Sequence, residues 1–206
     1  MKLLFVNACV REQSRTLLLA RHLLGQIPAE TTQINLEEEE LKPLTKDGLA
    51  AREQLASEGK WEDASFALAR QFAQADCIVI AAPYWDFGFP ALLKIYLERI
   101  SVAGITFRYD GGVPKGLCKA KTLVYVTTAG GPILSDFGFP YVRALAQSLY
   151  GIGETICIRA QNLDMDGEDV ADALEKAKQE IDGIKVMRSL EARRNHRKAM
   201  GCAGRS

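Results

Sequence analysis

Several features that mark other protein classes are missing from this sequence. Its five cysteines include no Cys-x-x-Cys pair and it has only two histidines, so neither a disulfide framework nor a zinc site is indicated and no bound metal is expected. The glycine-rich signatures G-x-G-x-x-G and G-x-x-x-x-G-K-[ST] are both absent. The apolar runs are too short for a secretory signal or a membrane span. We therefore expect a protein of the reducing cytoplasm with no membrane association.

An excess of charge of either sign is also missing. Lys and Arg total 26 and Asp and Glu total 26, which argues against a body built to bind nucleic acid or an anionic membrane. The balance is uneven, because six basic residues and one glutamate follow Met187. The length suits one domain. We predict a domain over residues 1–187 and a basic, mobile tail over residues 188–206.

Short continuous apolar runs are present, and each precedes a helical pattern. Because strands covered on both faces have continuous apolar runs, the pattern predicts an α/β three-layer sandwich around a five-stranded parallel sheet. The doubly wound order 2-1-3-4-5 is expected. The predicted strands are Leu3–Val6, Thr32–Leu36, Cys77–Ala82, Leu123–Thr127 and Thr155–Ile158. The predicted helices are Ser14–Leu24, Ala64–Ala75, Ala91–Ala103, Tyr141–Tyr150 and Glu168–Ile181.

The segment from Glu37 to Asp63 does not fit this alternation. It opens with four glutamates, which favour a hydrated surface because neighbouring carboxylates repel one another, and it indicates only a long polar connection. His22 lies among leucines on a predicted helix, so a structural imidazole is favoured over a catalytic one.

The loop after the first strand, Asn7–Thr16, has the character of an anion site. Ser14 can cap the following helix, whose first N–H groups are unpaired and whose dipole favours negative charge. Arg11, Arg15 and the hydroxyls of Ser14 and Thr16 add donors suited to a phosphate monoester. A role for Ser14 as an N-cap alone remains an equal alternative.

The loop after the third strand is rich in aromatic residues and runs from Pro83 through Tyr84, Trp85, Asp86 and Phe87 to Pro90. Its place at the carboxyl end of a buried strand is where open α/β sheets bind ligands, although such aromatics can also simply close the core. The loop after the fourth strand contains Thr128-Ala129-Gly130-Gly131, where paired glycines let the backbone approach a ligand.

Strands one, three and four are neighbours in the expected order, so these three loops meet at one edge of the sheet. A phosphate at the first loop and a flat ring between the other two describe a mononucleotide such as FMN. The predicted cofactor-binding residues are Cys9, Arg11, Ser14, Arg15, Thr16, Pro83, Tyr84, Trp85, Asp86, Phe87, Thr128, Ala129, Gly130 and Gly131.

The chain also resembles a known family. The stretch from Pro83 through Pro90, Leu93-Lys94 and Tyr96 to Ala103-Gly104-Ile105-Thr106-Phe107-Arg108-Tyr109, followed by Gly116-Leu117 and Gly130-Gly131, is similar to the FMN-dependent NADH azoreductases and quinone reductases. The resemblance covers residues 1 to 182. It implies a flavodoxin-like fold, noncovalent FMN, a homodimer with two active sites at its interface, and two-electron, ping-pong reduction of quinones or azo compounds by NADH or NADPH.

The resemblance also assigns roles to single residues. Ser14, Arg15 and Thr16 match the family's phosphate loop, with Cys9 where a hydroxyl residue is common. Tyr84 to Phe87 match the segment that holds the isoalloxazine, and Thr128 to Gly131 the loop that flanks it. The family usually has Asn where this chain has Asp86, and a carboxylate only accepts hydrogen bonds when ionised, so Asp86 is expected to lower the flavin potential.

The residues that would form the acceptor slot are less clearly marked. Phe107, Tyr109 and Phe137 are its expected walls, from one subunit or from its partner, and either Tyr84 or solvent would supply a proton. Three alternatives stay open at this point: a flavodoxin-type electron carrier, a flavin-dependent regulatory subunit without azo activity, and an α/β binding module without flavin.

Overall fold

The computed structural model describes residues 1–167 and 169–183. Their centre is a sheet of five parallel strands: β1 (Lys2–Asn7), β2 (Glu30–Asn35), β3 (Cys77–Ala81), β6 (Thr122–Thr128) and β7 (Glu154–Ala160). Every residue of β3 and β6 is buried, as expected for central strands covered on both faces. The predicted five-stranded parallel sheet is therefore confirmed.

The order of the strands is β2-β1-β3-β6-β7. Counted over all strands of the chain this order is 2-1-3-6-7 and differs from the expected 2-1-3-4-5. The difference arises because two further strands, β4 (Phe107–Asp110) and β5 (Val113–Gly116), come between β3 and β6 in the chain. These two strands form a separate antiparallel hairpin. Gly111 and Gly112 make its turn with φ of 59° and 83°, which is the left-handed geometry of a tight two-residue hairpin turn.

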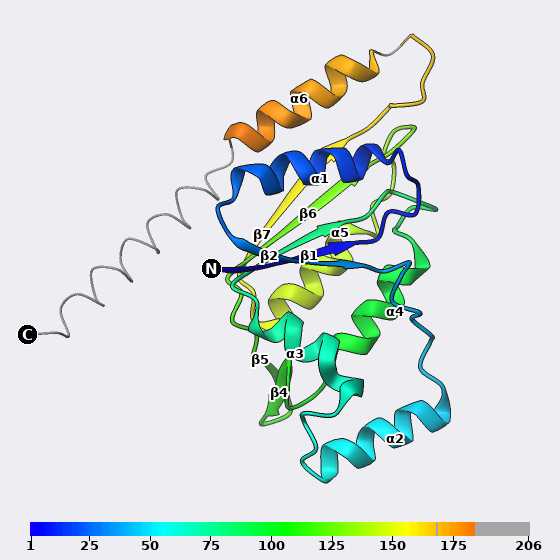
Figure 1. Ribbon diagram of the computed structural model, residues 1–206. Coiled ribbons are helices and arrows are strands. Elements are labelled where there is room, and N and C mark those ends of the chain that lie inside the picture. The colour runs from blue at the N-terminus through cyan, green and yellow to red at the C-terminus, as the bar shows by residue number, and fades with distance from the viewer. Residues whose placement is uncertain (168, 184–206) are drawn as a thin grey trace, which may run out of the picture.

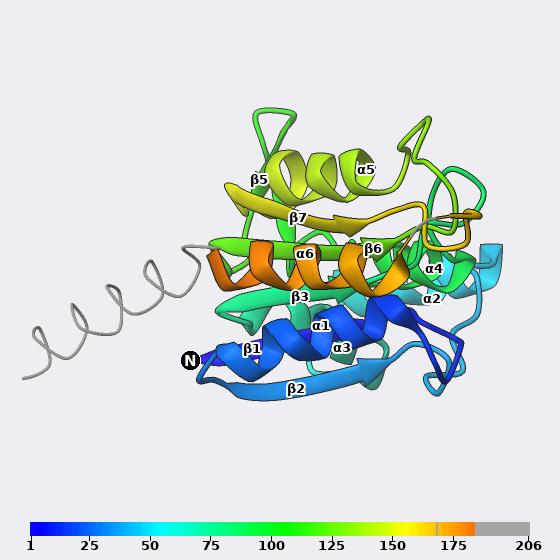
Figure 2. The ribbon, with the colours of Figure 1, turned by 90° about the horizontal axis from the view of Figure 1, so that it is seen from above.

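Helices cover both faces of the sheet (Figures 1 and 2). On one face α1 (Arg15–Gln26) and α6 (Val170–Gly183) pack on side chains such as Phe5 and Val79. The other face carries η1 (Ala64–Phe66), α3 (Ala67–Gln74), α4 (Ala91–Ile100), α5 (Phe139–Ala144) and the π-type turn η2 (Leu145–Tyr150). The three predicted layers are present.

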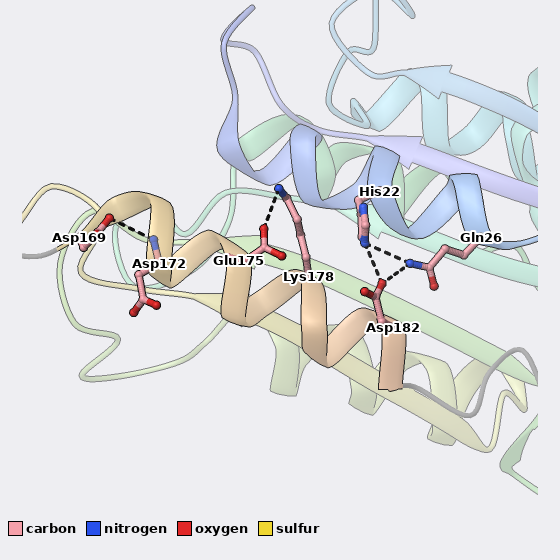
Figure 3. A network of polar contacts seen from close by, with 7 residues as sticks. All are labelled: His22, Gln26, Asp169, Asp172, Glu175, Lys178 and Asp182. Carbon is pink, nitrogen blue, oxygen red and sulfur yellow. Dashed lines mark hydrogen bonds and ion pairs between the residues drawn. The ribbon is translucent and has the colours of Figure 1, made fainter.

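Polar contacts join the two helices on the first face (Figure 3). His22 Nε2 on α1 lies 2.8 Å from Asp182 Oδ1 on α6 and 3.0 Å from Gln26 Nε2, which also donates to Asp182. Hydrogen bonding to His22, and then to Gln26, lowers the pKa of the Asp182 carboxyl. His22 thus has a structural contact far from the loops that carry the site residues.

The segment between β2 and η1 contains a helix that the sequence did not indicate. This helix, α2 (Lys46–Ser57), begins at Thr45, whose hydroxyl accepts from the Gly48 N–H at 3.1 Å, and none of its residues is buried. It is attached to α4 by Arg52 Nη1, which donates to Glu98 O at 3.2 Å. The prediction of a mere polar connection was wrong, because a capped helix without a buried face leaves no apolar stripe in the sequence.

The predicted basic tail, residues 188–206, lies outside the described residues. Within residues 1–167 and 169–183, none of the helices combines the length and the apolar character needed to cross a bilayer.

Candidate functional site

The loop between β1 and α1 presents free amide groups at the start of the helix. Ser14 is the N-cap, and its hydroxyl accepts from the Leu17 N–H at 3.2 Å. The amides of Arg15 and Thr16 have no hydrogen-bond acceptor among the residues that the structure describes. With the helix dipole behind them, these N–H groups form a binding position for an anion. Ser14 both caps the helix and lines the cavity described below.

Thr16 links this loop to the end of β6. Its Oγ1 lies 2.6 Å from Thr128 Oγ1, and both residues are buried. Each hydroxyl has one proton, so a hydrogen bond between them uses one donor and leaves the other for a further acceptor. Two loops that are far apart in the sequence are thereby held together at the site.

Cys9 is oriented toward the sheet. Its thiol donates to Ala81 O at 3.8 Å, and its backbone N–H donates to Asn7 Oδ1 at 3.1 Å. Burial raises the pKa of the Cys9 thiol, which keeps it protonated at neutral pH. Cys9 therefore supports the loop from behind and does not line the cavity.

The loop after β3 carries its aromatic side chains at the surface. The Tyr84 N–H donates to Thr128 O at 3.0 Å and its hydroxyl to Ser135 O at 2.6 Å, which ties this loop to the one after β6. Trp85 is 36% exposed and Phe87 53% exposed. The interpretation that these aromatics close the core fails for both residues, although it holds for Phe89, which is partly buried and packs against the core cluster that contains Tyr96 and Phe139.

A tight turn displays Asp86 and Phe87. Trp85 and Gly88 exchange backbone hydrogen bonds of 2.7 and 3.3 Å, and the two residues between them have φ of 48° and 65°. This left-handed pair is the geometry of a type I′ turn, which Asp tolerates and Phe adopts at a cost of about 1–3 kcal/mol. The Phe137 N–H donates to Phe87 O at 2.8 Å, which supports the strained turn from the neighbouring loop. Neither Asp86 nor Phe87 lines the cavity.

The glycine loop after β6 is paired with a fourth loop that the sequence did not single out, Gln161–Asp164 after β7. The N–H groups of Asn162, Leu163 and Asp164 donate to Gly131 O, Ala129 O and Gly130 O at 3.1, 3.2 and 2.8 Å. A Cβ on Gly130 would clash with Asp164 Oδ2, whereas one on Gly131 would meet nothing within 4 Å. The position of Gln161–Asp164 after a parallel strand was the available signal for this loop.

Arg15 reaches across to that loop. Its Nη1 donates to Leu163 O at 3.0 Å and to Asp164 Oδ1 at 2.7 Å. The four loops therefore form one connected rim at the carboxyl edge of the sheet.

The rim encloses a cavity of about 280 Å³. Free amides and Arg15 stand at its first-loop end, and Tyr84 and Trp85 stand beside it, so the donor set fits a phosphate ester that carries a flat ring. The volume is near the lower end for small-molecule sites, in keeping with a site that leaves part of its ligand open to other molecules. It is lined by Val10, Arg11, Gln13, Ser14, Arg15, Thr16, Pro83, Tyr84, Trp85, Thr128, Ala129, Gly130, Leu163 and Asp164.

The three residues expected to wall an acceptor slot are not brought together in one chain. Phe137 is 68% exposed and lies on the site side, next to Phe87. Phe107 and Tyr109 lie on the β4–β5 hairpin, with ring centroids 5.5 Å apart. That hairpin sits at the amino-end edge of the sheet, away from the loops of the rim (Figures 1 and 2).

The sequence is similar to a protein family and to several proteins of named activity. A family model described as the flavodoxin-like fold matches residues 1–184. An FMN-dependent NADH:quinone oxidoreductase of Lachnoclostridium phytofermentans is 32% identical over 188 residues, covering 86% of this chain and 94% of the relative. An FMN-dependent NADH:quinone oxidoreductase 2 of Clostridium acetobutylicum is 36% identical over 161 residues, covering 73% and 80%.

Solved structures of two azoreductases superpose on this chain. An FMN-dependent NADH-azoreductase of Bacillus anthracis, solved in complex with FMN, superposes with a TM-score of 0.74 at 25% identity, covering 88% of this chain and 96% of that one. An azoreductase of Bacillus anthracis str. Sterne superposes with a TM-score of 0.77 at 22% identity, over 88% and 96%, which shows a shared fold.

Proposed function

Since this chain belongs to the family of proteins with the flavodoxin-like fold, we propose that it is an FMN-dependent oxidoreductase that uses NADH or NADPH to reduce quinones or azo compounds. The single observation that carries the proposal is the cavity at the carboxyl edge of the sheet, with free amides and an arginine at one end and aromatic side chains beside it. Relatives that cover most of this chain bear names with the same activity.

In this proposal each loop has a separate task toward the cofactor. The amides of Arg15 and Thr16, with the Arg15 guanidinium, hold the phosphate. The Pro83–Trp85 and Thr128–Gly130 segments border the isoalloxazine, where the amide of Gly130 has no partner among the described residues and can donate to a ring oxygen or nitrogen. A flavin held by these segments would supply two-electron redox chemistry between the nicotinamide and the acceptor.

The acceptor slot is proposed to be completed by a second copy of the chain. Trp85, Phe87, Leu134 and Phe137 are exposed near the mouth of the cavity, and an exposed group of large apolar side chains is typical of an interaction surface. Since Phe107 and Tyr109 of the same chain lie at the other edge of the sheet, any contribution from them would come from the partner in a homodimer.

A reducing, cytoplasmic setting is proposed from the cysteines. Cys9, Cys77, Cys118 and Cys157 are all unpaired in the described part of the chain. Burial raises the pKa of Cys77 and of Cys118 to about 12, so these thiols stay protonated and serve as small apolar side chains of the core.

Steady-state kinetics of the FMN-loaded chain test the proposal. The oxidation of NADH should depend on an added quinone or azo dye, and plots of reciprocal rate at several acceptor concentrations should be parallel, as for a double-displacement reaction. A chain that binds FMN but passes electrons only to a protein partner, with no turnover of either small acceptor, would be an electron carrier and would contradict the proposal.

A further inference from the structure

Arg15 is held at one end only. Its Nη1 donates to two acceptors on the loop after β7, Leu163 O and Asp164 Oδ1. Its Nε and Nη2 have no acceptor in the part of the chain that the structure describes. Only Nη1 of the guanidinium is therefore engaged, and the edge formed by Nε and Nη2 keeps its donors free. A free edge of this kind matches the bidentate geometry in which arginine binds phosphate.

The acceptor loop is itself fixed by main-chain contacts. Asp164 donates its N–H to Gly130 O at 2.8 Å, and Leu163 donates to Ala129 O at 3.2 Å. Gly130 has no side chain, and the Asp164 carboxylate occupies the space where a Cβ would lie. The carboxylate thus stands in a defined place on the rim of the cavity, opposite the start of α1.

The negative charge of Asp164 must be compensated if the cavity is to bind a phosphate. A lone carboxylate lining a cavity for a phosphate dianion would repel the ligand. Its ion pair with Arg15, at 2.7 Å, offsets that charge while leaving the other guanidinium donors free. The exposed fractions of the two side chains, 38% and 63%, mean that the pair itself adds little to folding stability. Its effect should therefore be visible in ligand binding.

We propose that Asp164 is a positioning residue that holds Arg15 so that the free edge of the guanidinium meets the phosphate group of the flavin, and that this arrangement makes the site select phosphorylated over unphosphorylated flavin. The inference rests on the proposed function, because it takes FMN as the ligand. The sequence assigns the phosphate site to the loop between β1 and α1 alone, and the inference adds to it a residue of the loop after β7.

Titrations of the cofactor-free chain with FMN and with riboflavin, followed by quenching of flavin fluorescence, test this role. Riboflavin lacks the phosphate, so a change that merely loosens the site weakens both ligands equally. For Asp164→Asn we expect the affinity for FMN to fall about tenfold with riboflavin affinity unchanged. Arg15→Gln should lower FMN affinity at least as much, and Asp164→Asn should cause no further loss in the Arg15→Gln background, where the unpaired carboxylate only repels the phosphate.

Asp166→Asn is the matched control, because it removes the same charge two residues along from an exposed side chain with no hydrogen bond or ion pair in the described structure. It should leave the ratio of the two affinities unchanged. Asp164→Ser, which removes the whole carboxylate where Asp164→Asn removes only its charge, serves as the second variant should Asp164→Asn fold poorly.

Two outcomes would overturn the inference. Equal losses for FMN and riboflavin would make Asp164 a structural residue, and tighter binding of FMN by Asp164→Asn would make it a repulsive one. A wild-type chain that binds neither flavin would refute the proposed function instead, so the two failures are distinguishable.

Discussion

Thr16 Oγ1 lies 2.6 Å from Thr128 Oγ1, and this buried hydroxyl pair joins the start of α1 to the end of β6. The loop that offers amides to an anion and the loop that carries the paired glycines are thereby fixed relative to each other. The distance between the phosphate end and the ring end of the cavity is set in part by this one contact.

Replacement of either threonine by valine should destabilise the cofactor-free chain. Thr16→Val or Thr128→Val keeps the shape but leaves the other hydroxyl buried without its partner, at a cost of about 1–3 kcal/mol. The free energy of unfolding from urea titrations measures the effect. The double variant should be destabilised by less than the sum of the two single variants, since it leaves no buried hydroxyl without a partner. Strictly additive losses would show that the two hydroxyls do not interact.

Gly130→Ala should weaken FMN binding by about tenfold, or about 1.4 kcal/mol. The added Cβ would displace the Asp164 carboxylate and with it the acceptor of Arg15. Gly131→Ala is the matched control, because a Cβ there has open space around it. Titration of both variants with FMN, followed by quenching of flavin fluorescence, measures the two affinities. Similar affinities would contradict the prediction.

Gly116→Ala should destabilise the fold by more than about 3 kcal/mol. A Cβ at Gly116 would overlap the backbone of Tyr150 and Gly151, which cannot move as a side chain can. Gly153→Ala, where nothing lies within 4 Å, should change the free energy of unfolding by no more than about 1 kcal/mol. Thermal and urea unfolding compare the two, and equal effects would show that the hairpin does not rely on this close approach.

Asp86→Asn should raise the two-electron midpoint potential of the bound flavin by on the order of 30 mV. A negative charge near the cavity opposes the negative charge gained by the flavin on reduction, and the effect is small because the Asp86 carboxylate is exposed and lies outside the cavity lining. Asn also accepts positive φ, so the turn should persist. Asp47→Asn, at an exposed carboxylate in the first turn of α2, is the control, and a potential unchanged in Asp86→Asn would refute the role.

The sheet was predictable because buried parallel strands leave continuous apolar runs. Cys77–Ala81 and Thr122–Thr128 show this, and the carboxyl ends of these two strands and of β1 located three of the four loops. The β4–β5 hairpin also has a signal in the sequence, the dipeptide Gly111-Gly112 between short strands. Helix α2 had none, because its stability comes from a cap and from contacts made by the folded chain.

The parts of the site that the sequence did not predict depend on contacts between distant residues. Nothing in the sequence near Arg15 indicates Asp164, which becomes its partner only through the pairing of the two loops at Gly130. Cys9 is a second case, because the resemblance assigned it to the phosphate site as the replacement of a hydroxyl residue, whereas in the structure its thiol donates to Ala81 O. Both cases reflect side-chain direction, which depends on tertiary packing.

Anaerobic reduction of the FMN-loaded chain by NADH, followed by addition of a quinone, is the sharpest test of the proposed activity. The visible absorption of the flavin should bleach when NADH is added and return in full when the quinone is added, without any third component. A flavin band that persists in excess NADH, or that stays bleached in the presence of the quinone, would contradict the assignment of this chain as an FMN-dependent NADH:quinone oxidoreductase.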